Sequence, residues 1–412
     1  MREAQALEDD PRSQVEMLHT LGLAYEGLGD LASADRLLTD ALARSRTRLA
    51  DQPADTVGSL VALSELRLDQ ARLDEADALA REALDVSAAR LPPDAPVALA
   101  ALTALGRVQR DKGDYQAAIA TLASAVERYG RQDAERLPFT DALAALSETY
   151  YYVGDMAAAE RLSQQALDAT RRLRGPNHPD VGHALLNLGA VSASRGERAD
   201  AERQYRDALA ILSRWFGDDH PETASAMTIL AQLLGQQAPS TEAAGLLQRA
   251  IAVQARTFGE RHPRTAFVQN ELGMLAFRSE DYAAARQAFE QAVDGYGSSE
   301  GTHFQQAISL ANLGSVSLAT GDNRAAEQAF RQSLEIYAGV LPDDHLNVAI
   351  SRSKLGRALV RQGRREEAAP FLARAEAVLR GQPGPESSWL KATREDLAIL
   401  QQAPEPAVPV QR

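Results

Sequence analysis

The sequence contains no cysteine, which excludes disulfides, thiol nucleophiles and thiolate metal sites. Aromatic residues make up only 5% of the chain, whereas alanine is abundant and recurs in phase, as in helices whose backbones pack closely. No apolar run approaches the 18 residues that indicate a membrane span, and residues 1–4 do not begin a signal peptide. We therefore expect a soluble protein and assign it to the cytoplasm, although a chain without cysteine is compatible with either side of a membrane.

The charge balance excludes two classes of partner. There are 44 lysine and arginine residues against 57 aspartate and glutamate residues, a formal net charge of −13. Binding to the phosphate backbone of nucleic acid needs clustered cations, and so does binding to anionic membranes. We expect neither nucleic acid nor a membrane among the partners.

A small residue that follows an apolar one recurs every 41 or 42 residues. A period this long, held over most of a chain, indicates a repeat array in which each unit packs only against its neighbours. The small residue of this pair is Gly22, Ser64, Gly106, Ser147, Gly189, Ala231, Gly273, Gly314 and Gly356.

Each repeat reads as two helices joined by a short turn. Between Asp180 and Ser194, apolar residues fall at steps of three and four, and a second amphipathic pattern follows Gly196. Glycine at the break suits the positive φ that ends a helix tightly. Between repeats, a linker such as 175–179, Gly-Pro-Asn-His-Pro, places proline in the first turn of the next helix, where its missing N–H costs nothing.

The phased small positions resemble those of the tetratricopeptide repeat, and the Gly-x-x-His-Pro linker resembles its 42-residue, kinesin-light-chain-like type. In the fifth repeat the matching residues are Leu188, Gly189, Ala201, Tyr205 and Ala208. The resemblance implies an all-α fold. We expect a right-handed superhelical solenoid of nine antiparallel helix–turn–helix repeats with a C-terminal capping helix.

The domain organisation that we predict follows this array. Residues 1–12 form a lead-in, 13–380 the nine repeats, 387–402 the capping helix and 403–412 a disordered tail.

Motifs that suggest chemistry have simpler explanations. His178, His220, His262 and His345 recur with the repeat, so we interpret them as linker residues rather than metal ligands. The string 297–301, Gly-Ser-Ser-Glu-Gly, matches a nucleophile elbow, but that motif needs a preceding strand where this sequence predicts a helix. We expect no enzyme activity, no metal and no cofactor.

The resemblance also implies a binding surface, because the first helix of each repeat lines the concave face in this family. By register, the first four repeats contribute mainly acidic residues to this face, together with two basic residues, Arg107 and Arg110. The acidic residues are Glu16, Glu26, Glu65, Asp69, Asp141 and Glu148. The predicted partner-binding residues are Leu186, Asn187, Thr228, Gln232, Phe267, Asn270, Met274, Phe277, Ile308, Asn312, Lys354 and Arg357. His19 and His183 lie on the same predicted face.

These residues suit a peptide or helix of a partner protein. Amide side chains can donate to and accept from a peptide backbone, and methionine and phenylalanine supply adaptable apolar pockets. An acidic end of the partner would face Lys354 and Arg357. The alternative is that these residues only pack between neighbouring first helices.

The predicted function is therefore a non-catalytic protein-interaction scaffold. A second interpretation is a regulatory or sensor region of a bacterial serine/threonine kinase system, or a partner of such a kinase, because similar arrays follow kinase catalytic domains. The sequence has no kinase glycine loop or catalytic loop of its own.

Overall fold

A computed structural model of the chain describes residues 10–132, 137–236, 240–298, 303–382 and 385–401. These residues form nineteen α-helices and no strand, which confirms the all-α prediction. The chain divides into two compact units, Met1–Leu233 and Leu234–Arg412. We describe each unit by itself.

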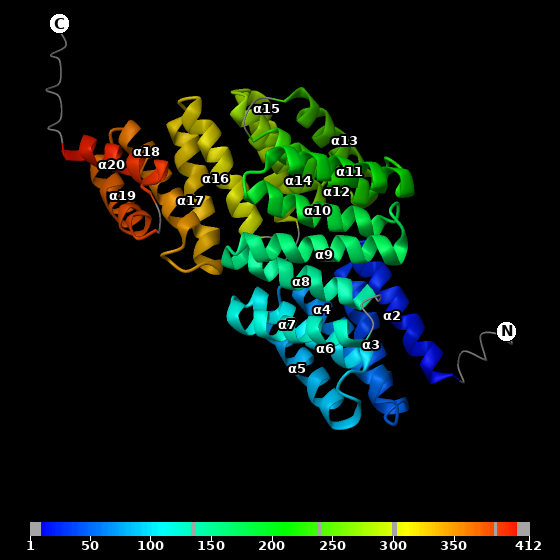
Figure 1. Cartoon of the computed structure of the whole chain (residues 1–412). Coiled ribbons are helices and arrows are strands. Elements are labelled where there is room, and N and C mark those ends of the chain that lie inside the picture. The colour runs from blue at the N-terminus through cyan, green and yellow to red at the C-terminus, as the bar shows by residue number, and fades with distance from the viewer. Residues whose placement is uncertain (1–9, 133–136, 237–239, 299–302, 383–384, 402–412) are drawn as a thin grey trace, which may run out of the picture. The chain divides into compact units, whose positions relative to one another are not determined.

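The first unit holds eleven helices in chain order (Figure 1). They are α2 (Pro11–Gly27), α3 (Leu31–Arg48), α4 (Pro53–Asp69), α5 (Leu73–Arg90), α6 (Pro96–Asp111), α7 (Tyr115–Gln132), α8 (Leu137–Val153), α9 (Met156–Arg174), α10 (Pro179–Ser194), α11 (Arg198–Phe216) and α12 (Pro221–Leu234).

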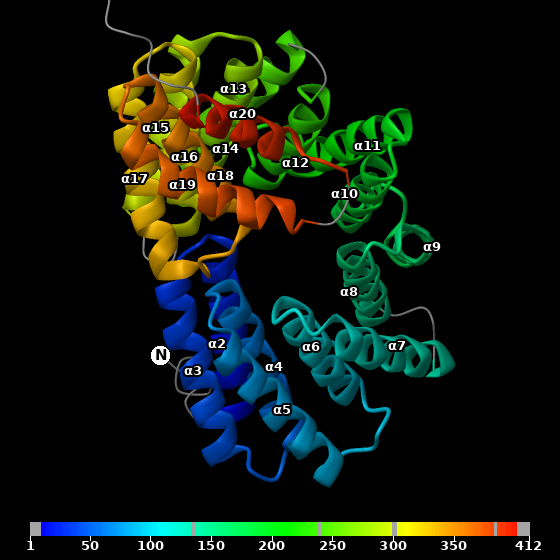
Figure 2. The same cartoon turned by 90° about the vertical axis from the view of Figure 1, so that its left-hand side faces the viewer.

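The second unit holds the remaining eight helices, which Figure 2 shows from another side. They are α13 (Thr241–Phe258), α14 (Pro263–Arg278), α15 (Tyr282–Gly297), α16 (His303–Ala319), α17 (Asn323–Val340), α18 (Leu346–Arg361), α19 (Arg365–Arg380) and α20 (Ser388–Gln401).

Helices pack in the order of the chain within each unit. From α2 to α11, and again from α13 to α20, every helix contacts the next. The first helices of successive repeats also contact one another, from α2 to α4, α6, α8 and α10, and from α14 to α16, α18 and α20. We call this continuous layer of first helices the A-helix wall. Its presence in both units is the arrangement of a tetratricopeptide solenoid.

The turns inside the repeats depend on a left-handed residue, as predicted. Gly29, Gly113, Gly154, Gly196, Gly321 and Gly363 all have φ near +80°. Two repeats place another residue there, Ala71 with φ of 57° and Glu280 with φ of 59°. Because a Cβ is strained in this region, these two turns are the least relaxed of the set.

The linker histidines cap the helices that follow them. Nδ1 of His178 accepts a hydrogen bond from the backbone N–H of Asp180 at 3.2 Å. His220, His262 and His345 bond the second residue after them in the same way. Each satisfies a backbone donor that the first helical turn leaves free. Their interpretation as framework residues is confirmed.

The small residue that recurs every 41 or 42 residues faces the second helix of its own repeat. A Cβ added at Gly273 would lie 2.7 Å from the ring of Phe289, and one added at Gly22 would lie 2.7 Å from Leu38. Gly106, Gly189, Gly314 and Gly356 face large side chains sixteen residues later in the same way. The register drawn from the sequence is therefore correct.

Three repeats fill this position differently, one with Ala231 and two with serine. Ser64 and Ser147 donate their hydroxyls to the carbonyl oxygens of Ala76 at 2.9 Å and Ala159 at 2.7 Å. Sixteen residues after each serine stands a small residue, Ala80 or Ser163, where the other repeats carry leucine, tyrosine or phenylalanine. Serine is thus paired with a small neighbour, and all six glycines are paired with a large one.

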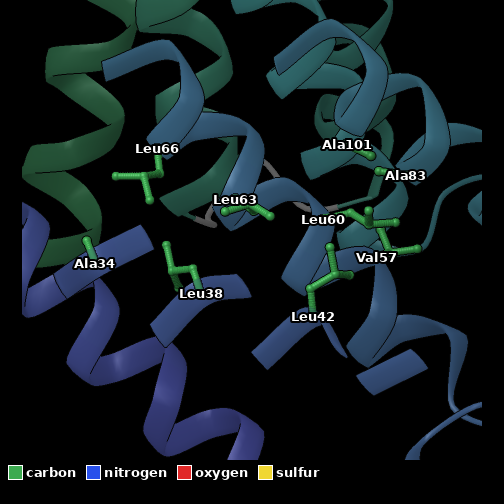
Figure 3. Packing of buried hydrophobic residues seen from close by; sticks show 9 residues of the cluster. All are labelled: Ala34, Leu38, Leu42, Val57, Leu60, Leu63, Leu66, Ala83 and Ala101. Carbon is green, nitrogen blue, oxygen red and sulfur yellow. The ribbon is translucent and has the colours of Figure 1, made fainter. Parts of the chain in front are cut away.

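The core consists of many small clusters between consecutive helices. Figure 3 shows one of them, in which Leu60 and Leu63 of α4 lie against Leu38 and Leu42 of α3. Ala83 of α5 and Ala101 of α6 extend this cluster to the next repeat. Such local packing is what a repeat architecture requires.

Several predictions concern residues outside those that the structure describes. They are part of the lead-in at 1–9, the tail at 403–412, and residues 299–301 of the elbow-like string. The domain boundaries and the handedness of the superhelix stay predictions. In the described part of the chain, no helix is long and apolar enough to cross a membrane.

Candidate functional site

A cavity of about 410 Å³ opens on the A-helix wall of the second unit. It lies between residues of α14, α16, α18 and α20, so three successive repeats and the last helix contribute to it. Five predicted partner-binding residues line it, namely Met274, Phe277, Asn312, Lys354 and Arg357. Because the other walls include Phe289, Leu318 and Trp389, the cavity is mainly apolar with cations on one side.

Lys354 is a cation of this cavity that the described residues leave without a carboxylate partner. Its Nζ donates to Ser315 Oγ at 2.8 Å and lies 4.7 Å from the centre of the Trp389 ring. Among the described residues, no carboxylate lies within ion-pair distance of this ammonium group. Burial and the neighbouring Arg357 lower the pKa of Lys354 to about 8. An anion that enters the cavity would relieve this cost.

Arg357 is already paired, unlike Lys354. Its Nε donates to Asp396 at 2.8 Å and its Nη2 donates to the carbonyl oxygen of Ala392 at 3.1 Å. Both acceptors belong to α20, so Arg357 holds the last helix against α18. Burial raises the pKa of Asp396, and Arg357 opposes that rise.

Residues of α20 were missed as site residues by the sequence analysis. Trp389 was placed only in a capping helix, yet it covers Lys354. A signal for this role does exist in the sequence. Asp396 stands 42 residues after Lys354, so one more step of the repeat register already places it on the same wall.

The predicted amide residues of the second unit bond to each other. Oδ1 of Asn270 accepts hydrogen bonds from Nδ2 of Asn312 at 3.2 Å and from Oγ of Ser309 at 3.1 Å. The bonds join α14 to α16, so the alternative interpretation, packing between first helices, applies to Asn270. Asn312 contributes to the packing between α14 and α16 and also lines the cavity.

The other two predicted residues of this unit lie outside the cavity. Phe267 of α14 is 45% exposed. Ile308 of α16 is partly buried against a cluster that includes Tyr337 and Val348.

In the first unit, Asn187 is the predicted residue with the most open surroundings. It is exposed on α10 and borders two cavities of about 330 Å³ and 460 Å³. His183 lines the smaller cavity, with Nε2 3.7 Å from a carboxylate oxygen of Glu222. These positions leave Asn187 and His183 accessible to a ligand.

The remaining predicted residues of the first unit differ in accessibility. Thr228 is 1% exposed and donates its hydroxyl to the carbonyl oxygen of Ala224, so it has no surface to offer a partner. Leu186 packs against a core cluster of α10, and Gln232 is half-buried on α12. We leave Thr228 out of the proposed site.

The acidic residues expected on the first-unit wall do influence one another. Burial, Asp69 and Glu65 raise the pKa of Glu26 to about 7. Burial raises the pKa of Glu65 and of Asp141, although Arg107 opposes both shifts. Because these carboxyls belong to α2, α4 and α8, negative charge accumulates along the wall as predicted.

Two ion pairs on this wall join neighbouring repeats. Arg107 donates to Glu65 at 3.2 Å, and Arg110 pairs with Glu148. Glu16 lies apart from the group, with its side chain 65% exposed. Among the described residues, no group of three or more histidine or carboxylate side chains is arranged to hold a metal ion.

Among the described residues that we predicted on the wall, His19 alone has a buried side-chain nitrogen without a hydrogen-bond partner. Its Nε2 is buried and has no hydrogen-bond partner among the described residues. Burial lowers the pKa of His19, which favours the neutral imidazole.

Solved structures provide a comparison for the fold. BtubC (BKLC) from P. vanneervenii is 26% identical over 55% of this chain and 91% of its own, with a TM-score of 0.50. The apo form of RapI is 11% identical, covers 89% of this chain and 97% of its own with a TM-score of 0.57, and shows the fold alone. Putative kinesin light chain repeats of Podosopora anserina are 25% identical over 50% of this chain and 99% of theirs, with a TM-score of 0.43. Among curated proteins, none matches this chain.

A family model decides the classification. The tetratricopeptide repeat model matches residues 55–131, 140–214, 183–254, 239–298 and 305–381, which together exceed half of the chain. Domains of this family are generally protein-interaction scaffolds. The chain belongs to the tetratricopeptide repeat family.

Proposed function

We propose that the protein is a non-catalytic scaffold that binds a segment of a partner protein on the A-helix wall of its second unit. The segment inserts an apolar side chain into the cavity beside Met274 and Phe277 and presents an acidic group to Lys354. Lys354 supports this proposal more than any other observation, because a half-buried ammonium group without a carboxylate partner among the described residues favours an anionic ligand.

The cavity also has the composition of a binding site. Sites for ligands are concave, mostly apolar and carry a few polar groups that fix orientation. Here Asn312 and Ser315 are those polar groups, and both lie on α16 next to the cation. Its volume of about 410 Å³ holds one or two side chains rather than a whole helix.

To test the proposal, we would remove the charge of Lys354 while keeping the shape of the cavity. Lys354→Met removes the charge and keeps an apolar chain of similar length, and Lys391→Met makes the same change of charge on the exposed surface of α20. A photoreactive residue in place of Phe277 captures the bound segment, which mass spectrometry identifies. We expect Lys354→Met to reduce capture at least tenfold and Lys391→Met to leave it unchanged.

Stability separates loss of binding from loss of fold. Lys354→Met relieves a buried charge, so its melting temperature should equal or exceed that of the original chain. Equal capture by both methionine variants would overturn the proposal. The identity of the captured protein also tests the alternative role, since a kinase in that position would favour a regulatory region of a kinase system.

A further inference from the structure

A second cavity of the second unit, of about 770 Å³, is lined by α13 and α15, the second helices of two neighbouring repeats. The linker 259–262 forms one edge of this cavity, and α14 contributes Gln269. The described residues that line it are all different from those around Lys354. We call it the Gln269 cavity, because Gln269 is its one buried lining residue and the others are half-buried or exposed. Its volume lies within the range of known ligand sites.

Gln269 brings an unsatisfied acceptor to this cavity. The side chain is 6% exposed, and its Oε1 is buried without a hydrogen-bond partner among the described residues. In seven of the nine repeats the residue at this place, four before the recurring small residue, is leucine or methionine. The fold therefore does not require a polar side chain here. A polar residue that breaks the local pattern and lacks an internal partner indicates a position kept for a ligand.

His262 brings a donor to the same cavity. Its Nδ1 accepts a hydrogen bond from the backbone N–H of Arg264 at 3.2 Å, so the proton of the neutral imidazole is on Nε2. Burial and the neighbouring Arg264 lower the pKa of His262, which favours this neutral form. Among the described residues, none accepts a hydrogen bond from Nε2. The cavity thus offers one acceptor and one donor that a ligand can use.

The remaining walls favour a ligand without charge. Arg261 donates from Nε and Nη2 to the carboxylate of Asp294 at 2.7 Å and 2.8 Å, so these two charges neutralise each other. Glu260 is exposed at the edge, where water solvates its carboxylate. Half-buried Ile251 and Phe258 of α13 supply apolar surface. A charged group that reached Gln269 would lose its hydration without gaining a counter-ion.

The spacing of the two free polar groups fits one tyrosine residue inside a peptide chain. His262 and Gln269 are seven residues apart, which places them on one side of α14 at about 10 Å along the helix axis. A tyrosine hydroxyl can donate to Oε1 of Gln269 while its ring lies against Ile251 and Phe258. The main-chain carbonyl of the same residue can then accept from Nε2 of His262. A free amino acid would bring an ammonium and a carboxylate, for which this cavity has no unpaired counter-charge nearby.

We propose that the Gln269 cavity binds a tyrosine side chain from a segment of a partner protein. Gln269 recognises the hydroxyl, and His262 recognises the main chain that carries the ring. This site is separate from the cavity around Lys354 and uses other residues, so either proposal can fail without the other.

Titration of the full chain with two capped amino acids tests recognition of the hydroxyl. The probes are N-acetyltyrosinamide and N-acetylphenylalaninamide, and ligand-observed NMR measures both dissociation constants. We expect the tyrosine probe to bind at least about fivefold more tightly, because its analogue leaves Gln269 unpaired. Gln269→Leu should remove this preference, whereas Gln287→Leu, at an exposed site on α15 outside the cavity, should keep it.

The melting temperature of each variant separates loss of binding from loss of fold. Leucine is the common residue at this place in other repeats, so Gln269→Leu should remain folded and should melt no lower than the original chain. Equal binding of the two probes to the original chain would overturn the proposal. So would a preference that survives in Gln269→Leu.

A third probe, p-cresol, distinguishes a tyrosine in a peptide from a free phenol. It carries the same ring and hydroxyl but no main chain. His262→Asn keeps a side-chain oxygen to cap α14 and removes the Nε2–H donor. We expect it to weaken the tyrosine probe at least about threefold and to leave p-cresol unchanged, while His178→Asn, the same change in the first unit, alters neither. If p-cresol binds the original chain as tightly as N-acetyltyrosinamide, the assignment to a partner protein is wrong.

Discussion

At the scale of single residues, Gln269 departs from the pattern of its repeat position. The residue four places before the recurring small residue is apolar in seven repeats, where it is Leu18, Leu60, Leu102, Leu143, Leu185, Met227 or Leu310. Gln269 stands there in the seventh repeat, is 6% exposed, and its Oε1 has no hydrogen-bond partner among the described residues. Arg352 stands there in the ninth repeat, but it donates to the carbonyl oxygen of Asp343 at 2.8 Å.

Replacing Gln269 by the leucine of its neighbours should stabilise the protein. A buried acceptor without a partner costs about 1–3 kcal/mol, so we expect Gln269→Leu to raise the free energy of unfolding by roughly 1–2 kcal/mol. Urea denaturation followed by circular dichroism measures it. The reverse change in the next repeat, Leu310→Gln, should lower the same quantity by a similar amount or more.

Loss of stability in Gln269→Leu would contradict this account. It would show that the carboxamide is satisfied, for which the adjoining cavity of about 770 Å³ has room. Gln269 lines that cavity together with Phe258 and His262.

At the scale of helices, the contact between the two members of a repeat is set by one pair of residues. Where the recurring small residue is glycine, a large side chain fits sixteen residues later, as with Gly189 and Tyr205. Serine is paired with a small residue instead, as with Ser147 and Ser163, whose hydroxyl oxygens are 2.7 Å apart. The two positions should therefore be coupled in energy.

A double-mutant cycle at Gly189 and Tyr205 tests this coupling. Gly189→Ser alone forces a Cβ into the tyrosine ring and should cost about 1–3 kcal/mol of stability. In the background of Tyr205→Ser the same change should cost little, because the pair then copies Ser147 and Ser163. We expect a coupling free energy of at least about 1 kcal/mol from chemical denaturation. Additive effects would show that the two residues do not share one contact.

At the scale of the whole molecule, negative charge is the dominant electrostatic feature. The net charge is −13, and part of it gathers on the wall of the first unit around Glu26, Glu65 and Asp141. Burial raises the pKa values of these carboxyls, and repulsion from neighbouring carboxylates adds to each shift. At these three carboxyls the folded chain therefore holds protons more tightly than the unfolded chain does.

The stability of the protein should consequently fall as the pH rises from about 4.5 to 7. The pKa of Glu26 is raised from 4.5 to about 7, so its favourable contribution is complete below the lower value and lost through the upper one. Glu26→Gln keeps the shape and removes the charge, so its melting temperature should exceed that of the original chain at pH 8 but not at pH 4. Glu16→Gln, at an exposed site on the same helix, should follow the original chain. If the profile of Glu26→Gln runs parallel to that of the original chain, this account is wrong.

Much of the fold was predictable because its determinants are local and repeated. Gly196 ends a helix through its own φ, His178 caps the helix two residues later, and Gly189 is small because Tyr205 lies against it. These reasons recur at nearly constant spacing, the turn glycine in six repeats, the capping histidine in four linkers and the glycine beside a large side chain in six repeats, so one repeat reveals many of the others.

The candidate site was only partly predictable. Periodicity correctly placed Lys354 and Asn312 on the A-helix wall, because orientation along a helix follows from register. Register does not reveal how far a neighbouring helix covers a side chain, which is why Thr228 was expected to be accessible and is buried. Nor does it show that Arg357 is paired with Asp396 while Lys354 lacks a carboxylate.

The sequence by itself thus determined the class of fold, the register of the repeats and the side of each helix that faces the wall. These properties depend on contacts within a repeat, where spacing along the chain equals spacing in the molecule. Only the tertiary structure decided the division into two units, the cavity beside Trp389 and the exposure of Met17 and Leu21 on α2. Those features depend on which helix covers which neighbour, and no single repeat contains that information.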